Sequence, residues 1–228
     1  MLRHTLFASI LSLCIVSAAL AEGGTASFNQ LIGAGNRHVQ AGDYAAALEA
    51  YTQASEMAGS DAEKYVIAIT SVARAHRLLK QYEEAHASLA AGLKHEVSTF
   101  VRALLLMELG VVFEIEGKLD DAIAQYTKVR EMHDIPVPIK VGAEMSCGRA
   151  NHTLKNYIEA ESHFKAVAEN PDAPQVHKVD SVLWLGWTSM AMGESNSAQA
   201  HFQAVLDDPL AAPEQKKKAR DSLDQITQ

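Results

Sequence analysis

The chain has 228 residues, and 48% of them are apolar or aromatic. Its 20 Lys and Arg residues are outnumbered by 28 Asp and Glu residues, which gives a formal charge of −8. This acidic balance argues against a nucleic-acid partner, because phosphates attract basic proteins, and against attraction to an anionic membrane surface.

Residues 1–21 are predicted to be a cleaved signal peptide. A positively charged start is followed by an apolar run over residues 6–20, and Ala21 ends the small-x-small pattern that signal peptidase cleaves. The apolar run has about 15 residues, against the roughly 20 that span a bilayer, so no stable membrane insertion is expected after cleavage. A lipoprotein attached through Cys14 is the alternative. We therefore predict a chain that is secreted across the inner membrane into the periplasm and begins at Glu22.

The mature chain has the pattern of helices throughout, with no β-type alternation. A lead segment of small residues, 22–27, precedes a pattern that recurs five times over residues 28–212 and predicts five helix pairs. In chain order, the pairs are expected at about residues 28–57, 62–94, 98–133, 138–169 and 174–207. A final helix is expected over residues 213–228, where a thin apolar stripe is surrounded by charges.

Four positions define each copy of the pattern. The first helix carries a small residue at Gly35, Ala73, Gly110, Gly148 and Gly186. A turn residue follows at Gly42, Lys80, Gly117, Lys155 and Gly193. The second helix carries Ala47, Ala85, Ala122, Ala160 and Ala198, and one turn later a large residue at Tyr51, Leu89, Tyr126, Phe164 and Phe202. Because alanine stands where a larger side chain would bury more surface, we expect the helix backbones to approach closely there.

This pattern resembles the tetratricopeptide repeat, and the resemblance covers nearly all of the chain after residue 27. It implies an all-α, right-handed superhelical solenoid of five helix pairs, with residues 213–228 as a capping helix. The copies are longer than the family's usual repeat, since Ala47, Ala85 and Ala122 stand 38 and 37 residues apart. The prolines lie in the linkers, where Pro138 and Pro174 are expected at helix starts, as is Pro213.

The resemblance also implies a binding surface. In similar proteins, the first helices line a concave groove that holds a segment of a partner protein. The family's groove positions correspond here to Ile32, Asn36, Arg74, Arg77, Met107, Val111, Met145, Arg149, His152, Trp187 and Met190. Met and Trp side chains would anchor apolar groups of the partner, and the arginines would match acidic ones. The family's clamp for a C-terminal carboxylate is not expected, because Ile32, Ile67 and Ser71 replace polar or basic residues of that set.

No motif for catalysis is present: the sequence has no Gly-rich phosphate loop, no G-x-S-x-G and no H-E-x-x-H. We therefore expect neither an enzyme nor a cofactor. His38 and His76 share the repeat position of Phe113, which favours packing over metal ligation, so no metal site is expected. Cys147 stands where Leu185 stands in another copy, and we expect it to be a buried small hydrophobe.

The sequence thus predicts an exported scaffold that binds a partner protein segment in its groove, in assembly or regulation of a bacterial envelope. Two alternatives stay open. One is a structural homo-oligomer that packs end to end, and the other is a metal- or pH-responsive binding protein built on the histidines. The basic run from Lys216 to Arg220 is interpreted as the solvated face of the cap, and it is the second candidate for a binding surface.

Overall fold

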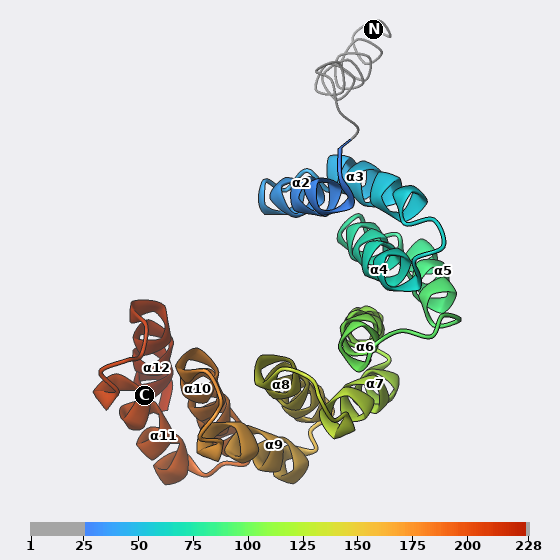
Figure 1. Ribbon diagram of the computed structural model, residues 1–228. Coiled ribbons are helices and arrows are strands. Elements are labelled where there is room, and N and C mark those ends of the chain that lie inside the picture. Colours follow the sequence, from blue (N-terminus) through green and yellow to red (C-terminus); the bar gives the residue numbers. More distant parts are fainter. Residues whose placement is uncertain (1–25, 227–228) are drawn as a thin grey trace, which may run out of the picture.

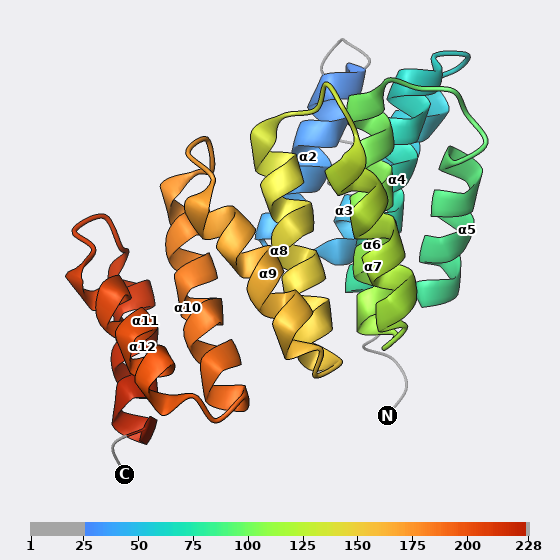
Figure 2. The same ribbon diagram turned by 90° about the horizontal axis from the view of Figure 1, so that it is seen from below.

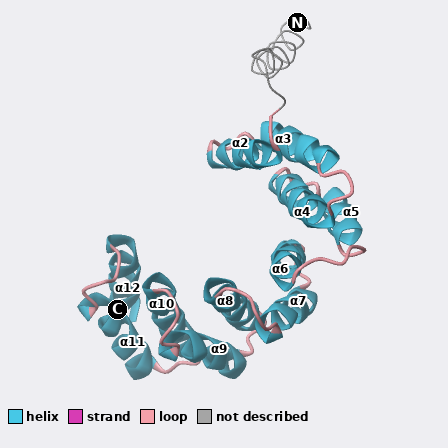
Figure 3. Ribbon diagram, viewed as in Figure 1, coloured by secondary structure: helices cyan, strands magenta, loops and turns pink. Residues whose placement is uncertain are grey.

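The computed structural model describes residues 26–226, and in this range every regular element is a helix (Figures 1 and 3). The predicted signal peptide and residues 22–25 of the lead segment lie outside the described residues. None of the helices in residues 26–226 combines the length and the apolar character of a membrane span.

Five helix pairs and a final helix follow one another along the chain. The first helices of the pairs are α2 (Phe28–Gln40), α4 (Ala62–Leu78), α6 (Thr99–Ile115), α8 (Val137–Thr153) and α10 (Gln175–Ala191). The second helices are α3 (Tyr44–Met57), α5 (Tyr82–Gly92), α7 (Leu119–Glu131), α9 (Tyr157–Glu169) and α11 (Ser195–Asp207), and α12 (Pro213–Ile226) ends the described chain. The predicted all-helical solenoid of five pairs with a terminal helix is confirmed.

The pairs stack into an arc. Figure 1 shows the first helices and α12 on the inner side of this arc and the second helices on its outer side. Figure 2 shows the same stack from below, with neighbouring helices side by side. Each second helix packs against its own first helix and against the first helix of the next pair, so the core runs as a strip along the arc.

The turn inside each pair has the same backbone conformation in all five copies. The turn residue has a positive φ, from 62° at Lys80 to 79° at Gly193. The next residue donates its backbone N–H to a carbonyl five residues earlier, as Asp43 does to His38 over 2.9 Å. This bond satisfies a carbonyl at the end of the first helix. Asp43 then caps α3 by accepting from the Ala46 N–H over 3.1 Å.

The small residue of the first helix lies directly against the large residue of the second. A Cβ added at Gly110 would lie 2.4 Å from Tyr126 Cε1, and one added at Gly148 would lie 2.5 Å from Phe164 Cε1. Gly35 and Gly186 meet their aromatic partners in the same way. The second copy carries Ala73 with the smaller Leu89 in place of an aromatic ring, and both are fully buried. Each copy therefore divides a similar volume between the two positions.

The junction between the second and third pairs divides its volume differently. Gly92 ends α5, and a Cβ there would lie 2.5 Å from Leu105 Cδ1 of α6. One pair later, the larger Val129 and the smaller Ala143 occupy the corresponding positions in the same core. At the junction of the second and third pairs, the large residue is Leu105 on the first helix of the later pair. At the junction of the third and fourth pairs, the larger residue is Val129 on the second helix of the earlier pair.

Candidate functional site

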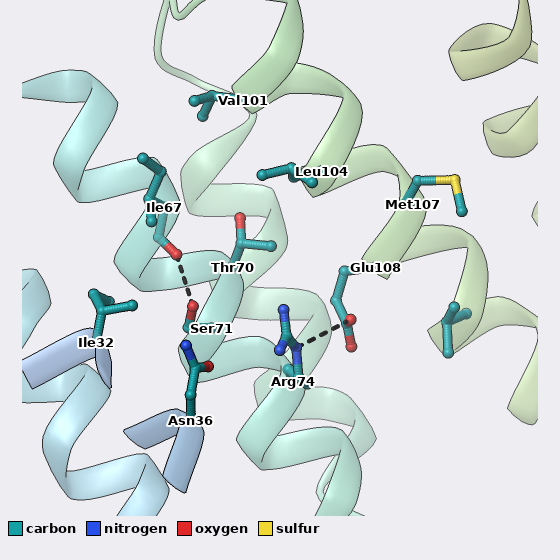
Figure 4. Close-up of a pocket in the computed structure, with 11 residues that line it drawn as sticks. Ile32, Asn36, Ile67, Thr70, Ser71, Arg74, Val101, Leu104, Met107 and Glu108 are labelled. Atoms are coloured by element: carbon teal, nitrogen blue, oxygen red, sulfur yellow. Dashed lines mark hydrogen bonds and ion pairs between the residues drawn. The ribbon is translucent and has the colours of Figure 1, made fainter. Parts of the chain in front are cut away.

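The inner surface of the arc is hollowed between α2, α4 and α6 (Figure 4). The hollow has a volume of about 320 Å³. Its lining comes from first helices alone and consists of Ile32, Asn36, Ile67, Thr70, Ser71, Arg74, Val101, Leu104, Met107, Glu108 and Val111. Of the groove residues predicted from the sequence, Ile32, Asn36, Arg74, Met107 and Val111 lie here, on three different helices.

The hollow has an apolar end and a polar end along the helices. Ile67, Val101 and Leu104 lie towards the N-terminal ends of α4 and α6, and Arg74 and Glu108 lie one to two turns further along (Figure 4). Between them, the hydroxyls of Thr70 and Ser71 donate to backbone carbonyls of α4, over 2.7 and 3.0 Å. These hydroxyls are therefore satisfied within their own helix.

The charged groups at the polar end are not equivalent. Arg77 Nε donates to Glu108 Oε1 over 2.5 Å, whereas Arg74 Nε lies 3.9 Å from Glu108 Oε2. The side chain of Arg77 is 17% exposed and that of Glu108 is 10% exposed, but the side chain of Arg74 is 41% exposed. Arg77 therefore compensates the charge of Glu108, and Arg74 keeps most of its hydrogen-bonding capacity for another group.

A hydrogen bond from the core fixes the side chain of Asn36. The hydroxyl of Tyr51, a residue with no exposed surface, donates to Asn36 Oδ1 over 2.7 Å. Because the amide oxygen is used in this bond, the Nδ2 group of Asn36 is left as a hydrogen-bond donor at the hollow. Burial of the ring also raises the pKa of Tyr51 despite the nearby charge of Arg74, so the phenol stays protonated and can donate.

The predicted groove residues of the fourth pair have other surroundings. Met145 is only 6% exposed and belongs to the core around Phe164, so it offers little surface to a partner. Arg149 donates to the hydroxyl of Ser146 over 3.0 Å. His152 contacts the rings of Tyr157 and Trp184, and burial lowers its pKa.

The predicted groove residues of the fifth pair pack towards the cap. Trp187 Nε1 donates to the hydroxyl of Ser222 on α12 over 2.9 Å, and the indole contacts Trp184 and Phe202. Met190 packs on the same cluster. Arg74 and Arg77 thus lie together, while Arg149 and Trp187 belong to different environments further along the arc.

A second charged network lies between the third and fourth pairs. Glu144 Oε1 accepts from His163 Nδ1 over 2.7 Å and from Arg130 over 3.1 Å. Burial alone would raise the pKa of Glu144, but the hydrogen bond from His163 and the charge of Arg130 outweigh it and hold this pKa below its ordinary value. The network joins α7, α8 and α9, which gives it a structural role.

The sequence predicts that Cys147, His38 and His76 have packing roles. Cys147 is fully buried, as expected, and burial raises the pKa of its thiol, which disfavours the reactive thiolate. His38 and His76 are half-buried, and the ring of His76 bonds to Gln81 over 2.9 Å. Within residues 26–226, no group of three or more His, Cys, Asp or Glu is placed to hold a metal ion.

Glu108 is the charged residue of the hollow that was not predicted from the sequence. It is the one acidic residue in the run from Ala103 to Phe113, at the repeat position of Ser71 and Ser146. A single charge on the buried side of an apolar helix requires a partner, and this requirement is the signal that could have identified Glu108.

Comparison with known proteins agrees with this architecture. Residues 72–132, from the C-terminal half of α4 through α7, match the family model of the tetratricopeptide repeat. No curated protein matches the chain.

Solved structures, among them tetratricopeptide repeat proteins, share the fold of the described chain. One is a tetratricopeptide repeat protein from Parabacteroides merdae, with 17% identity, a TM-score of 0.64, and coverage of 88% of this chain and 73% of that one. A thermophilic protein of Thermus thermophilus has 16% identity and a TM-score of 0.59, with coverage of 86% and 99%. A chain of the APC/C hetero-tetramer Cut9–Hcn1 has 17% identity and a TM-score of 0.64, but this chain spans only 36% of its length.

These similarities and the five stacked helix pairs lead to one assignment. The five pairs have the fold of tetratricopeptide repeat proteins, and residues 72–132 match the family's sequence model.

Proposed function

We propose that this chain is an exported scaffold that binds a segment of a partner protein in the hollow between α2, α4 and α6. A tetratricopeptide repeat fold is that of a protein–protein interaction scaffold. The observation that carries the proposal is the hollow itself, where apolar side chains adjoin a half-exposed arginine on the inner surface. Such a combination is typical of sites that anchor an apolar side chain and orient it with a charge.

The proposed location rests on the sequence. The pattern of residues 1–21 supports export, and we propose assembly or regulation of a bacterial envelope as the setting. The Cut9–Hcn1 assembly offers a parallel, since a protein of the same fold works there within a complex of two kinds of chain.

An end-to-end oligomer receives less support from the cap. Lys217 and Asp221 of α12 stand at the repeat positions of Val179 and Leu183 in α10. The two α10 residues are 3% and 1% exposed because α11 and α12 cover them, whereas Lys217 and Asp221 are exposed. At this end, charged side chains take the positions on which another repeat would stack.

The test is capture of partners by the mature chain and two matched variants. Met107→Arg places a bulky charge at the hollow, and Ile158→Arg places the same side chain on the outer surface of α9, where Ile158 is 74% exposed. We expect Met107→Arg to lose the partners that the wild type captures and Ile158→Arg to keep them, with equal thermal melting of both variants. Retention of every partner by a folded Met107→Arg variant would place the binding surface elsewhere, with the basic run of α12 as the remaining candidate.

A further inference from the structure

Building on the proposed function, we propose that the hollow recognises a partner segment through an acidic side chain within that segment. Its carboxylate would bond to Arg74, and aliphatic side chains beside it would enter the apolar part of the hollow.

The first step of the argument is the charge at the polar end. Arg74 and Arg77 carry two positive charges, and Glu108 carries one negative charge, so one positive charge remains in a chain that is acidic overall. The short contact between Arg77 and Glu108 places that remaining charge on Arg74. A guanidinium with open donors in a partly desolvated hollow forms its strongest hydrogen bonds with a carboxylate.

The second step is the kind of hydrogen bond that the hollow offers. Thr70 and Ser71 use their hydroxyl hydrogens within α4, and Glu108 is compensated by Arg77. Among the described lining residues, the side chains that still have donor hydrogens for a ligand are Arg74 and Asn36. Both are donors, and Figure 4 shows both side chains at the polar end. The free donor hydrogens of the hollow therefore suit a ligand group that accepts hydrogen bonds.

The third step places the carboxylate inside the partner chain and not at its end. Apolar side chains flank Arg74 on both sides of the hollow, with Ile32 of α2 on one side and Met107 of α6 on the other (Figure 4). A C-terminal carboxylate at Arg74 would leave one of these apolar walls without a contact. A side-chain carboxylate lets the segment continue across both walls and bury apolar surface on each.

The experiment selects binders from a synthetic library of short peptides with acetylated N-termini and amidated C-termini. The wild type should enrich peptides with Asp or Glu flanked by aliphatic residues, and changing that acid to its amide should weaken binding about tenfold or more, as for loss of a charge-assisted bond. Arg74→Gln should bind the acidic and the amide peptide within about twofold of each other. Arg74→Lys should keep a weaker preference for the acid, and Lys128→Gln, at an exposed position of the outer helix α7, should behave as the wild type.

The possible results separate this inference from the proposed function. If the selected peptides lose binding to Met107→Arg but show no preference for an acid, or keep the preference in Arg74→Gln, this inference fails and the groove proposal stands. Binding that requires a free C-terminal carboxylate, in a parallel library without amidation, would likewise overturn the side-chain assignment. If the peptides bind Met107→Arg as tightly as the wild type, the proposed function fails as well.

Discussion

The contact between small and large residues can be tested with one substitution made at two places on the same helix. Gly148 and Gly142 both lie within α8. A Cβ at Gly148 would meet three ring carbons of Phe164 at 2.5, 2.8 and 2.9 Å, whereas a Cβ at Gly142 would meet only Met107 Cε, at 3.8 Å. Gly148→Ala is therefore the perturbation, and Gly142→Ala is its matched control.

The two variants share every effect of the substitution except the contact. Replacing glycine by alanine inside a helix stabilises it by about 1 kcal/mol, and this gain applies to both. The ring of Phe164 has no exposed surface and is stacked on Trp184, with 5.4 Å between centroids and 15° between planes. It has no open space to enter, so Gly148→Ala should add an overpacking cost of about 1–3 kcal/mol. This cost is the expected difference in unfolding free energy between the two variants.

The assay is urea unfolding followed by far-ultraviolet circular dichroism. We expect Gly142→Ala to unfold at the wild-type midpoint or above it and Gly148→Ala to unfold clearly below Gly142→Ala. Adding Phe164→Leu to Gly148→Ala should recover part of the loss, because the second copy already combines Ala73 with Leu89. Equal midpoints for the two alanine variants would refute the argument that contact with the ring requires glycine here.

Three further predictions concern other parts of the solenoid. Ala122→Leu, at a residue with no exposed surface, should cost roughly 1–3 kcal/mol by overpacking, and an unchanged denaturant midpoint would contradict this. Ser222→Ala removes the acceptor for Trp187 Nε1 and should cost about 1 kcal/mol, seen as faster amide exchange in α12; unchanged exchange would show that this bond does not hold the cap. Because the pKa of Glu144 is lowered in the folded state, its bond to His163 adds stability above the ordinary carboxyl pKa that is lost as the pH falls through the folded value. Glu144→Gln should therefore be less stable than the wild type at pH 7 and approach it in acid, and a constant gap in urea unfolding across this range would be evidence against the lowered pKa.

The repeat architecture could be predicted because every copy has the same kinds of residue at the same packing positions. Small residues, turn residues and large residues return at fixed spacing, and the structure places Lys80 and Lys155 at the same positive φ as the glycines. The residue type at such a position is set by its own backbone conformation or by contact with one neighbour, as at Gly148, which contacts Phe164. Five copies then reinforce one another.

The site could be predicted only in part, because register does not show which neighbours each side chain meets. Arg74 and Arg77 have equivalent status in the sequence, yet Glu108 of the next pair binds Arg77 closely and leaves Arg74 more exposed. Trp187 stands at a groove position, but its contact with α12 depends on where the cap helix packs. These distinctions arise between repeats, in contacts that the pattern of one repeat does not contain.

Site-specific photocrosslinking in cells tests the central claim most directly, that a partner segment lies in the hollow between α2, α4 and α6. A photoreactive residue would replace Met107 in the hollow or, as the control, Ile158 on the outer face of α9. We predict that illumination links a partner protein to the chain from position 107, and that adding Arg74→Glu reduces this product. A partner linked from position 158 and not from 107 would contradict the account.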